Sequence, residues 1–238
     1  SLAFQPVVGV DSEAIMGFEA LLRWNSQDFG PVSPAKFIPL AEESGLIIDI
    51  SNWVFNEVCS NIKQWKAQNR QELQMSINTS PSHYFNLESN ITQWLNLLLD
   101  QKISARSILL EVTENLLMEA NEMVSKKLFQ FRQAGVDIAL DDFGAGYSSI
   151  SYLKRFPTDF IKIDRSFVKS MTDVSNDKVL CEATIVMANK LGIKVVAEGV
   201  ETQEQYDILK SMGCDYAQGY FIAKPLSKSD FESFWERH

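Results

Sequence analysis

The sequence predicts an α/β protein built as a (β/α)8 TIM-like barrel with an antiparallel first strand. Short β-rich runs alternate with longer amphipathic stretches, and from Gln74 onward strand and helix follow each other without a break. That alternation is typical of a parallel β/α fold. The chain has 238 residues and contains eight strand candidates, and both features fit such a barrel. A doubly wound open sheet is the alternative.

The first two strand candidates cover residues 3–8 and 15–24. The segment between them is too short for a crossover helix, so we expect an antiparallel hairpin and an irregular start to the barrel. Six further strand candidates follow, at residues 74–78, 108–113, 137–141, 160–164, 194–198 and 216–221.

Helical patterns fill the segments between the strands. Pro34 marks one helix start, and apolar residues keep one face of the next helix at Val54, Val58 and Ile62. The segments "EMVSKKLFQFRQAG" and "CEATIVMANKLG" both end at a glycine that favours a helix stop. No linker, low-complexity stretch or charge block interrupts the pattern, so we interpret residues 1–238 as one domain.

The composition excludes several classes of protein. A net charge of −9 argues against a nucleic-acid partner and against a polybasic membrane contact. A phosphate-containing ligand then needs metal cations to supply local positive charge. The three cysteines stand singly, without metal-ligand spacing, which fits a reducing compartment. No stretch is apolar enough to span a bilayer and no signal peptide is visible, so we expect a cytoplasmic location.

Polar residues occupy one face of nearly every predicted strand. Residues two apart share a face, so Glu19 opposes its neighbours Phe18 and Ala20. The same alternation in the later strands sets apart Asn78, Glu111, Asp141, Lys162, Asp164, Glu198 and Gln218. A layer of helices would cover the apolar faces, which leaves the polar side chains toward the barrel axis. Most lie at carboxyl ends of strands, where barrel active sites lie. A structural ion-pair network is the less favoured alternative.

Five of these positions form an oxygen-rich group whose like charges need cations: Glu19, Asn78, Glu111, Asp141 and Asp142. By parity Asp141 points inward, and Asp142 joins it only where the chain bends out of the strand. Nearby glycines permit such a bend.

The kind of donor predicts the kind of metal. The chain has only His83 and His238 as histidines, and neither is a plausible ligand. Oxygen donors favour Mg²⁺ or Mn²⁺ over zinc. Five candidate ligands suggest two ions with Asp141 between them, an arrangement that activates water for phosphoryl displacement.

Eight short motifs follow one another along the chain: "FQPVV", "EALLRW", "SINTSP", "EVTE", "DDFGAGYSS", "KID", "AEGVE" and "QGYFIAKP". In these motifs, in their order and over essentially the whole chain, the sequence resembles the EAL-domain cyclic-di-GMP phosphodiesterases. The tripeptide of the family name stands at residues 19–21. A lone Glu-Ala-Leu carries no weight, whereas eight ordered motifs are very specific.

The resemblance implies a role for each matching residue. One metal ion would be held by Glu19, Asn78, Glu111 and Asp141, and a second by Asp141 and Asp142. Lys162 and Glu198 would hold and deprotonate the attacking water, with Glu198 as the base. The remaining roles are supporting ones: Gln218 for the water network, Glu114 for the loop at residues 142–149, and Glu201 for the "AEGVE" turn.

The resemblance also implies the substrate contacts. Arg23 would contact a phosphate, Gln5 a guanine, and Leu21 and Asp164 other parts of the substrate. The departures from the family are small, because Ala145 stands where the family often has Thr, and the variation in "QGYFIAKP" at residues 222–223 removes no ligand.

The expected function is therefore metal-dependent hydrolysis of cyclic-di-GMP to linear pGpG. The alternative is a cyclic-di-GMP receptor that binds without cleaving. Such a receptor is expected to lack one of four acidic residues, and all four are present: Glu19, Glu111, Asp141 and Glu198. An unrelated barrel enzyme that uses two Mg²⁺ ions would require the eight motifs to be coincidence.

The resemblance has consequences for assembly too. We expect a homodimer formed near "YSSISYLKRF", which offers Tyr147, Ile150, Tyr152, Leu153 and Phe156. We also expect a regulatory sensor domain outside this chain, in a longer signalling protein that is either free in the cytoplasm or anchored to the membrane.

Several aromatic and charged residues have simpler interpretations. We expect Trp53, Trp65 and Trp94 in the core or at an interface, and His83 at the surface of a loop. The Glu42-Glu43 pair is expected on a solvated helix face.

Overall fold

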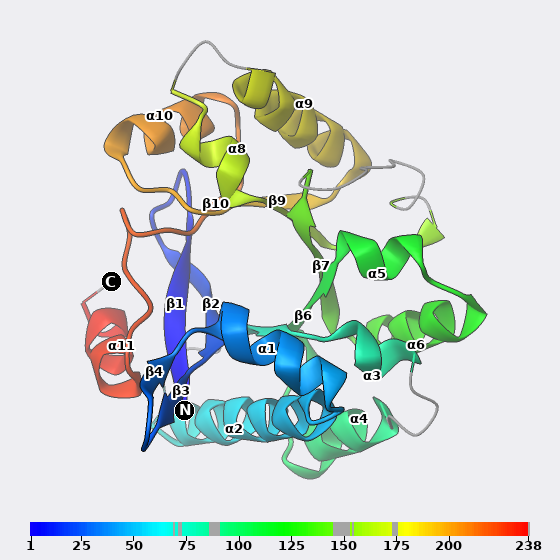
Figure 1. Cartoon of the computed structure of the whole chain (residues 1–238). Helices are drawn as coiled ribbons and strands as arrows, with labels where there is room; N and C mark the ends of the chain where they lie inside the picture. Colours follow the sequence, from blue (N-terminus) through cyan, green and yellow to red (C-terminus); the bar gives the residue numbers. More distant parts are fainter. Residues whose placement is uncertain are drawn as a thin grey trace.

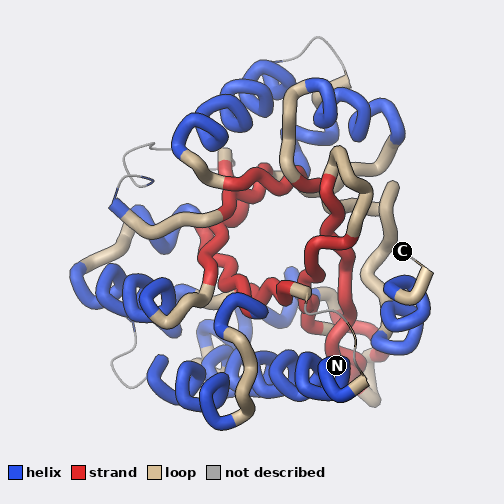
Figure 2. Tube along the Cα trace, turned by 180° about the vertical axis from the view of Figure 1, so that it is seen from behind, coloured by secondary structure: helices blue, strands red, loops and turns tan. Residues whose placement is uncertain are grey.

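The computed structural model describes residues 1–68, 70, 73–85, 91–144, 153, 155–172 and 176–237. Within these residues, eight strands close into a barrel in the order β1-β10-β9-β8-β7-β6-β5-β2. Figure 1 shows the strands as a central ring and the helices around its outside, and Figure 2 shows the same ring from behind. The predicted barrel is confirmed.

The first strand runs against its neighbours on both sides. β1 (Leu2–Gly9) pairs antiparallel with β2 (Ile15–Leu22), and Gln5 lies directly opposite Glu19 in this ladder. β1 also pairs antiparallel with β10 (Tyr216–Ala217) and so closes the barrel. The expected hairpin and irregular start are therefore both present.

The other strands are parallel, and most match their predicted ranges. They are β5 (Gln74–Asn78), β6 (Ile108–Thr113), β7 (Asp137–Phe143), β8 (Phe160–Ile163) and β9 (Lys194–Ala197). β10 has two residues where the sequence predicted six. Beyond β10, Gly219 packs so closely on Val200 that an added Cβ would lie 2.1 Å from the Val200 carbonyl oxygen.

A small hairpin outside the barrel was not predicted. β3 (Trp24–Ser26) and β4 (Gly30–Val32) form a two-stranded sheet of their own. The predicted strand 15–24 therefore ends at Leu22. Gly30 takes a left-handed φ of 64° at the start of β4, a conformation that glycine adopts at little cost.

The described helices surround the barrel: α1 (Pro34–Glu43), α2 (Ile47–Ala67), α3 (Pro81–Phe85), α4 (Ile91–Asp100), α5 (Glu114–Met118), α6 (Glu122–Gln133), α8 (Arg165–Lys169), α9 (Asn176–Leu191), α10 (Gln203–Ser211) and α11 (Lys228–Trp235). A short 3-10 turn, η1, covers Ala105–Ser107. Gly135 and Gly192 follow α6 and α9 with φ of 93° and 74°, so the two predicted helix stops are confirmed.

The core lies between the outer faces of the strands and the helices. Phe231 of α11 packs against Phe18 and Phe4, with ring centroids 4.0 and 5.2 Å apart. Trp65 and Trp94 are buried, as expected. Trp53 is 41% exposed and lines an apolar surface pocket, so it lies outside the core.

The prediction for His83 was wrong. The residue lies on α3 and is 7% exposed, with its ring 4.9 Å from that of Trp94. The "SPS" segment before it suggested a surface loop, but α3 turns the imidazole toward the neighbouring helices. Burial, together with the Lys127 ammonium, lowers the pKa of His83 to about 4.

In the part of the chain that the structure describes, no helix has both the length and the apolar character needed to cross a bilayer.

Candidate functional site

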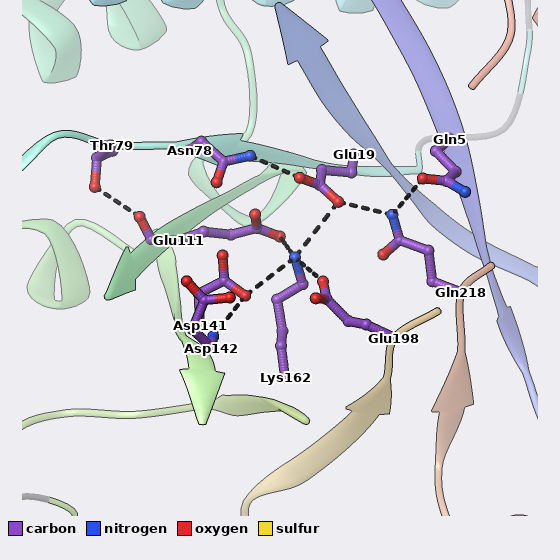
Figure 3. A network of polar contacts seen from close by, with 10 residues as sticks. All are labelled: Gln5, Glu19, Asn78, Thr79, Glu111, Asp141, Asp142, Lys162, Glu198 and Gln218. Carbon is purple, nitrogen blue, oxygen red and sulfur yellow. Dashed lines mark hydrogen bonds and ion pairs between the residues drawn. The ribbon is translucent and has the colours of Figure 1, made fainter. Parts of the chain in front are cut away.

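The polar residues singled out by strand parity converge at the carboxyl end of the barrel. Glu19, Glu111 and Lys162 are buried on β2, β6 and β8. Asn78 is the last residue of β5, and Glu198 directly follows β9. Figure 3 shows these side chains pointing toward one another from separate strands.

Lys162 lies at the centre of this group (Figure 3). Its Nζ is 2.6 Å from Glu198 Oε1 and 2.7 Å from Glu111 Oε1. Glu19 Oε2 and Asp141 Oδ1 lie slightly farther away, at 3.4 and 3.6 Å. One ammonium therefore serves four carboxylates, which leaves three negative charges if all four ionise. The site holds more negative charge than its own residues balance.

Glu19 is held by three groups. Asn78 Nδ2 donates to Oε1 at 2.6 Å, and Gln218 Nε2 donates to Oε2 at 2.7 Å. Burial alone would raise the pKa of Glu19, but the Lys162 ammonium and the two amide hydrogen bonds outweigh it, so the pKa lies below its usual value. Glu19 is thus a carboxylate fixed in position and charge.

Glu111 is in the opposite state. Burial and the nearby Glu19 carboxylate raise its pKa well above the ordinary value, and the Lys162 ammonium offsets only part of this. Its Oε2 is buried and has no hydrogen-bond partner among the described residues. Gln218 Oε1 is a second buried acceptor in that position. Both atoms suit a ligand that brings positive charge or a proton donor.

Asp141 and Asp142 both reach the site because β7 is irregular there. The register with β8 shifts between Leu140 and Phe143, and Asp142 has a left-handed φ of 54°. The backbone N–H of Asp142 donates to Asp141 Oδ1 at 2.9 Å. The sequence analysis expected a bend here, because Asp142 can join Asp141 only where the chain leaves the strand. The structure contains this bend. Burial and the Asp141 carboxylate raise the pKa of Asp142.

Glu198 responds to the same excess of negative charge. Burial raises its pKa to about 8, and the carboxylates of Asp141 and Glu19 add to this against the Lys162 ammonium. In this arrangement Glu198 carries a proton at neutral pH. A cation nearby would favour the ionised form of this carboxyl group.

The donor set fits a hard divalent cation. One carboxylate oxygen each from Asp141, Asp142 and Glu198 lie within 4.8 Å of one another. The side chains around Lys162 are carboxylates, Asn78 and Gln218 add amide groups, and His83 lies beside Trp94 instead. Oxygen donors of this kind suit Mg²⁺, Mn²⁺ or Ca²⁺ better than zinc.

Glu198 offers a carboxylate oxygen to the same cluster as Asp141 and Asp142, whereas the sequence analysis gave it the role of base. Strand alternation predicted that Glu198 lies at the carboxyl end of the barrel, but its role as a base was inferred only from the resemblance to the family. Thr79 is a second residue that was missed. Its Oγ1 donates to the Glu111 backbone carbonyl at 2.7 Å and lies 3.1 Å from the buried Tyr84 hydroxyl, so it ties the ends of β5 and β6 together. The motif "SINTSP" contained that signal.

The predicted substrate contacts have protein partners in the structure. Asp164 caps the start of α8, accepting from the Ser166 backbone N–H at 3.0 Å. Arg23 Nη1 donates to the Leu22 carbonyl at 2.9 Å, and Leu21 is half-buried at the end of β2. Gln5 is buried and bonded to Gln218, a contact described below.

The structure describes Glu114 and Glu201, which were assigned supporting roles, but only part of the loop and of the expected dimer contact. Glu114 is buried at the first position of α5, directly after β6. Glu201 is exposed, and its backbone N–H donates to Gln205 Oε1 at 2.7 Å in the cap of α10. Of the loop 142–149, residues 145–149 lie outside the described residues. Tyr147, Ile150 and Tyr152 of the expected dimer contact also lie outside them, whereas Leu153 and Phe156 are buried.

Comparison with known proteins gives a consistent result. The EAL domain family model matches residues 1–225. MucR of Pseudomonas aeruginosa, described as a bifunctional diguanylate cyclase/cyclic di-GMP phosphodiesterase, is 36% identical over 225 residues, which are 94% of this chain and 33% of MucR. This chain spans about a third of the length of the curated relatives it matches.

Two solved structures are similar over most of the chain. The PaMucR phosphodiesterase in complex with c-di-GMP has a TM-score of 0.91 at 35% identity and covers 97% of this chain and 93% of that one. The calcium/cyclic-di-GMP complex of Klebsiella pneumoniae BlrP1 has a TM-score of 0.78 at 30% identity and covers 94% of this chain and 55% of that one. With its closed barrel, its acidic carboxyl-end site and a family match over residues 1–225, this chain belongs to the EAL domain family.

Proposed function

We propose that this domain is a metal-dependent phosphodiesterase that hydrolyses cyclic-di-GMP to linear pGpG. The observation that carries the proposal is the surplus of carboxylates around Lys162 at the active-site end of an EAL barrel. The naming of MucR as a cyclic di-GMP phosphodiesterase and the c-di-GMP in its solved structure support the substrate.

Two Mg²⁺ or Mn²⁺ ions are proposed to occupy the site. The residues that would hold one are Glu19, Asn78, Glu111 and Asp141, and those that would hold the other are Asp141 and Asp142. Bound ions of this type supply Lewis acidity toward the phosphodiester and lower the pKa of a bound water. The calcium in the BlrP1 complex supports divalent cation binding in this family.

The protein's own groups position the water and move its proton. Glu198 accepts the proton of the attacking water once the added positive charge has lowered its pKa from about 8. Lys162 Nζ, 2.6 Å from Glu198 Oε1, holds that carboxylate in place and stabilises negative charge that develops on the phosphate. Gln218 offers its free Oε1 to a water hydrogen, and Glu114 is proposed to support the loop that follows β7.

The substrate is proposed to lie over the carboxyl end of the barrel. Arg23 would exchange its hydrogen bond with the Leu22 carbonyl for a charge-assisted bond to a phosphate oxygen. Leu21 and Asp164 would contact other parts of the substrate. In the full protein we propose one such domain over residues 1–238, joined to a sensor domain, paired with a second copy and located in the cytoplasm.

The direct test is incubation of the purified chain with cyclic-di-GMP and Mg²⁺ or Mn²⁺, followed by chromatography for pGpG. We expect stoichiometric conversion, and about a 10²- to 10⁴-fold loss of kcat in Glu198→Gln. A wild-type chain that binds cyclic-di-GMP without releasing any pGpG would instead be a receptor. Equal turnover by wild type and Glu198→Gln would remove the base assignment.

A further inference from the structure

Gln5 lies beside the acidic group because the first strand is antiparallel. It faces Glu19 directly across the β1–β2 ladder, where side chains on one face are close neighbours. Gln5 is 8% exposed. A parallel first strand would have placed a different residue opposite Glu19. The antiparallel start of the barrel is therefore the reason that Gln5 is the neighbour of Glu19.

The Gln5 amide is used at both ends. Its Nε2 donates to the Ala223 backbone carbonyl at 3.1 Å, and its Oε1 accepts from Gln218 Nε2 at 3.3 Å. The same Nε2 of Gln218 donates to Glu19 Oε2 at 2.7 Å. A chain of hydrogen bonds therefore runs from the main chain at Ala223, through two amides, to a carboxylate of the proposed metal site. Figure 3 shows the part of this chain from Gln5 to Glu19.

The direction of this chain is fixed at its far end. A carbonyl oxygen only accepts, so Ala223 requires the NH2 group of Gln5 and turns the Gln5 oxygen toward Gln218. Gln218 must then present its NH2 group to both Gln5 and Glu19. A flipped Gln218 amide would place its oxygen against two acceptors, one of them a carboxylate.

One buried atom of Gln218 shows the consequence. Its Oε1 has no hydrogen-bond partner among the described residues, and Figure 3 shows it on the side away from Gln5, toward Glu198. An acceptor held there suits a water that donates a hydrogen. The orientation of this acceptor depends on Gln5.

We propose that Gln5 is a positioning residue that acts through Gln218, rather than a guanine contact. Its hydrogen bond locks Gln218 so that the amide group donates to Glu19 and the carbonyl oxygen faces the site. This inference rests on the proposed function, which supplies the reaction that Gln5 serves. Partners in the second layer of a metal site commonly change metal affinity or activity by about 10- to 100-fold when removed.

The test uses two phosphodiester substrates and one metal measurement. Gln5→Met keeps the length of the side chain and removes both hydrogen bonds. We expect it to lower kcat by about 10- to 100-fold on cyclic-di-GMP and by the same factor on bis(p-nitrophenyl) phosphate, which has no guanine. KM for cyclic-di-GMP should change little, and Mn²⁺ affinity, measured by electron paramagnetic resonance of the free ion, should fall.

A double-mutant cycle shows whether Gln5 acts through Gln218. In a Gln218→Met background, Gln5→Met should cause no further loss of Mn²⁺ affinity or kcat, because the group it positions is gone. Gln5→Asn is a second variant that keeps an amide but is one methylene too short to reach Ala223 and Gln218 together, so it should behave like Gln5→Met. Val58→Ala, in the buried face of α2 outside the barrel, is the control for general loss of stability.

Other results would overturn the inference. A raised KM for cyclic-di-GMP, with unchanged hydrolysis of bis(p-nitrophenyl) phosphate and unchanged Mn²⁺ affinity, would make Gln5 a guanine contact. Additive losses in the cycle, or equal losses in Val58→Ala, would show that Gln5 acts elsewhere or only on stability. If wild type hydrolysed neither substrate, the proposed function would fail, while the Mn²⁺ cycle would still decide the role of Gln5.

Discussion

The two ends of the barrel carry the same kinds of charged side chain in opposite arrangements. At the amino end, two partly exposed ion pairs form one to one: Lys194 with Asp215 at 2.6 Å and Arg132 with Asp159 at 2.8 Å. At the carboxyl end, Lys162 is 2% exposed and shared among four carboxylates. Each of these two amino-end pairs balances its own charge, whereas the carboxylates around Lys162 outnumber the single ammonium among them.

Removal of divalent metal should produce the largest difference between the two ends. We expect EDTA to abolish cyclic-di-GMP cleavage and Mg²⁺ or Mn²⁺ to restore it. Ca²⁺ should inhibit, because its larger and more variable shell positions water poorly. Bound metal at about 100 times its Kd should also stabilise the fold by about 2.7 kcal/mol, measured by chemical denaturation with and without EDTA. Full activity in the chelator would show that cleavage does not depend on metal at the carboxyl end.

Substitution of the central lysine should have the next largest effect. Lys162→Met leaves the carboxylates without a counter-ion, and loss of one partner from a buried ion pair costs about 3–5 kcal/mol. We expect this loss of unfolding free energy in EDTA, partial recovery in Mg²⁺, and kcat lowered by about 10²- to 10⁴-fold.

The matched control lies at the opposite end. Lys194 makes a comparable contact with Asp215, but it is exposed, and such pairs contribute about 0–1 kcal/mol. Lys194→Met should therefore leave both stability and turnover nearly unchanged. If the two variants lost the same free energy of unfolding in EDTA, the ion pairs of Lys162 would contribute no more to stability than the exposed pair of Lys194.

His83 is expected to make the stability of the fold sensitive to acid, independently of the carboxylates at the carboxyl end of the barrel. Burial lowers the pKa of His83 to about 4, below its usual 6.5. Between these values the unfolded chain binds a proton that the folded chain does not, so stability falls as pH drops through this window, by about 3 kcal/mol in total. His83→Phe should flatten this part of the curve of unfolding free energy against pH. Parallel curves for the variant and wild type would assign the acid sensitivity to other groups.

The smallest effect concerns the bend at Asp142. Its left-handed φ of 54° is tolerated by Asp and Asn but costs other L-residues about 1–2 kcal/mol. Asp142→Asn should keep the unfolding free energy of wild type and lose metal affinity, whereas Asp142→Ala should lose metal affinity and about 1 kcal/mol of stability as well. Denaturation in EDTA and Mn²⁺ titration measure the two properties separately. Equal stability of both variants would show that the bend is not strained.

Much of the rim could be predicted from local pattern alone. Alternation along each strand gave the inward face of Glu19, Glu111 and Lys162, because a period of two is fixed by strand geometry. The adjacent pair at residues 141–142 also indicated the bend in β7, since only a departure from the strand brings both side chains to one side.

What the sequence did not predict depends on contacts between distant segments. Lys162 lies at the centre of the carboxylates only because the closed barrel brings side chains of β2, β6, β7 and the residue after β9 to the same end as that of β8, and no local pattern encodes those distances. The burial of His83 depends on Trp94 from another helix. β10 ends two residues before Gly219, whose close approach to Val200 is likewise a contact between distant segments. The β3–β4 hairpin involves two strands of three residues each, too short for an alternating pattern to show.

The antiparallel closure of the barrel also constrains the order of folding. Within this domain β1 is synthesised well before β10, which is its second neighbour in the barrel. Phe4 of β1 also pairs with the main chain of Leu226 and packs on the ring of Phe231, and both partners are synthesised later still. Contacts between residues so far apart in sequence slow folding. During synthesis the amino-terminal strand therefore has an unpaired edge until almost the whole domain has left the ribosome, which makes this stage the one most exposed to aggregation.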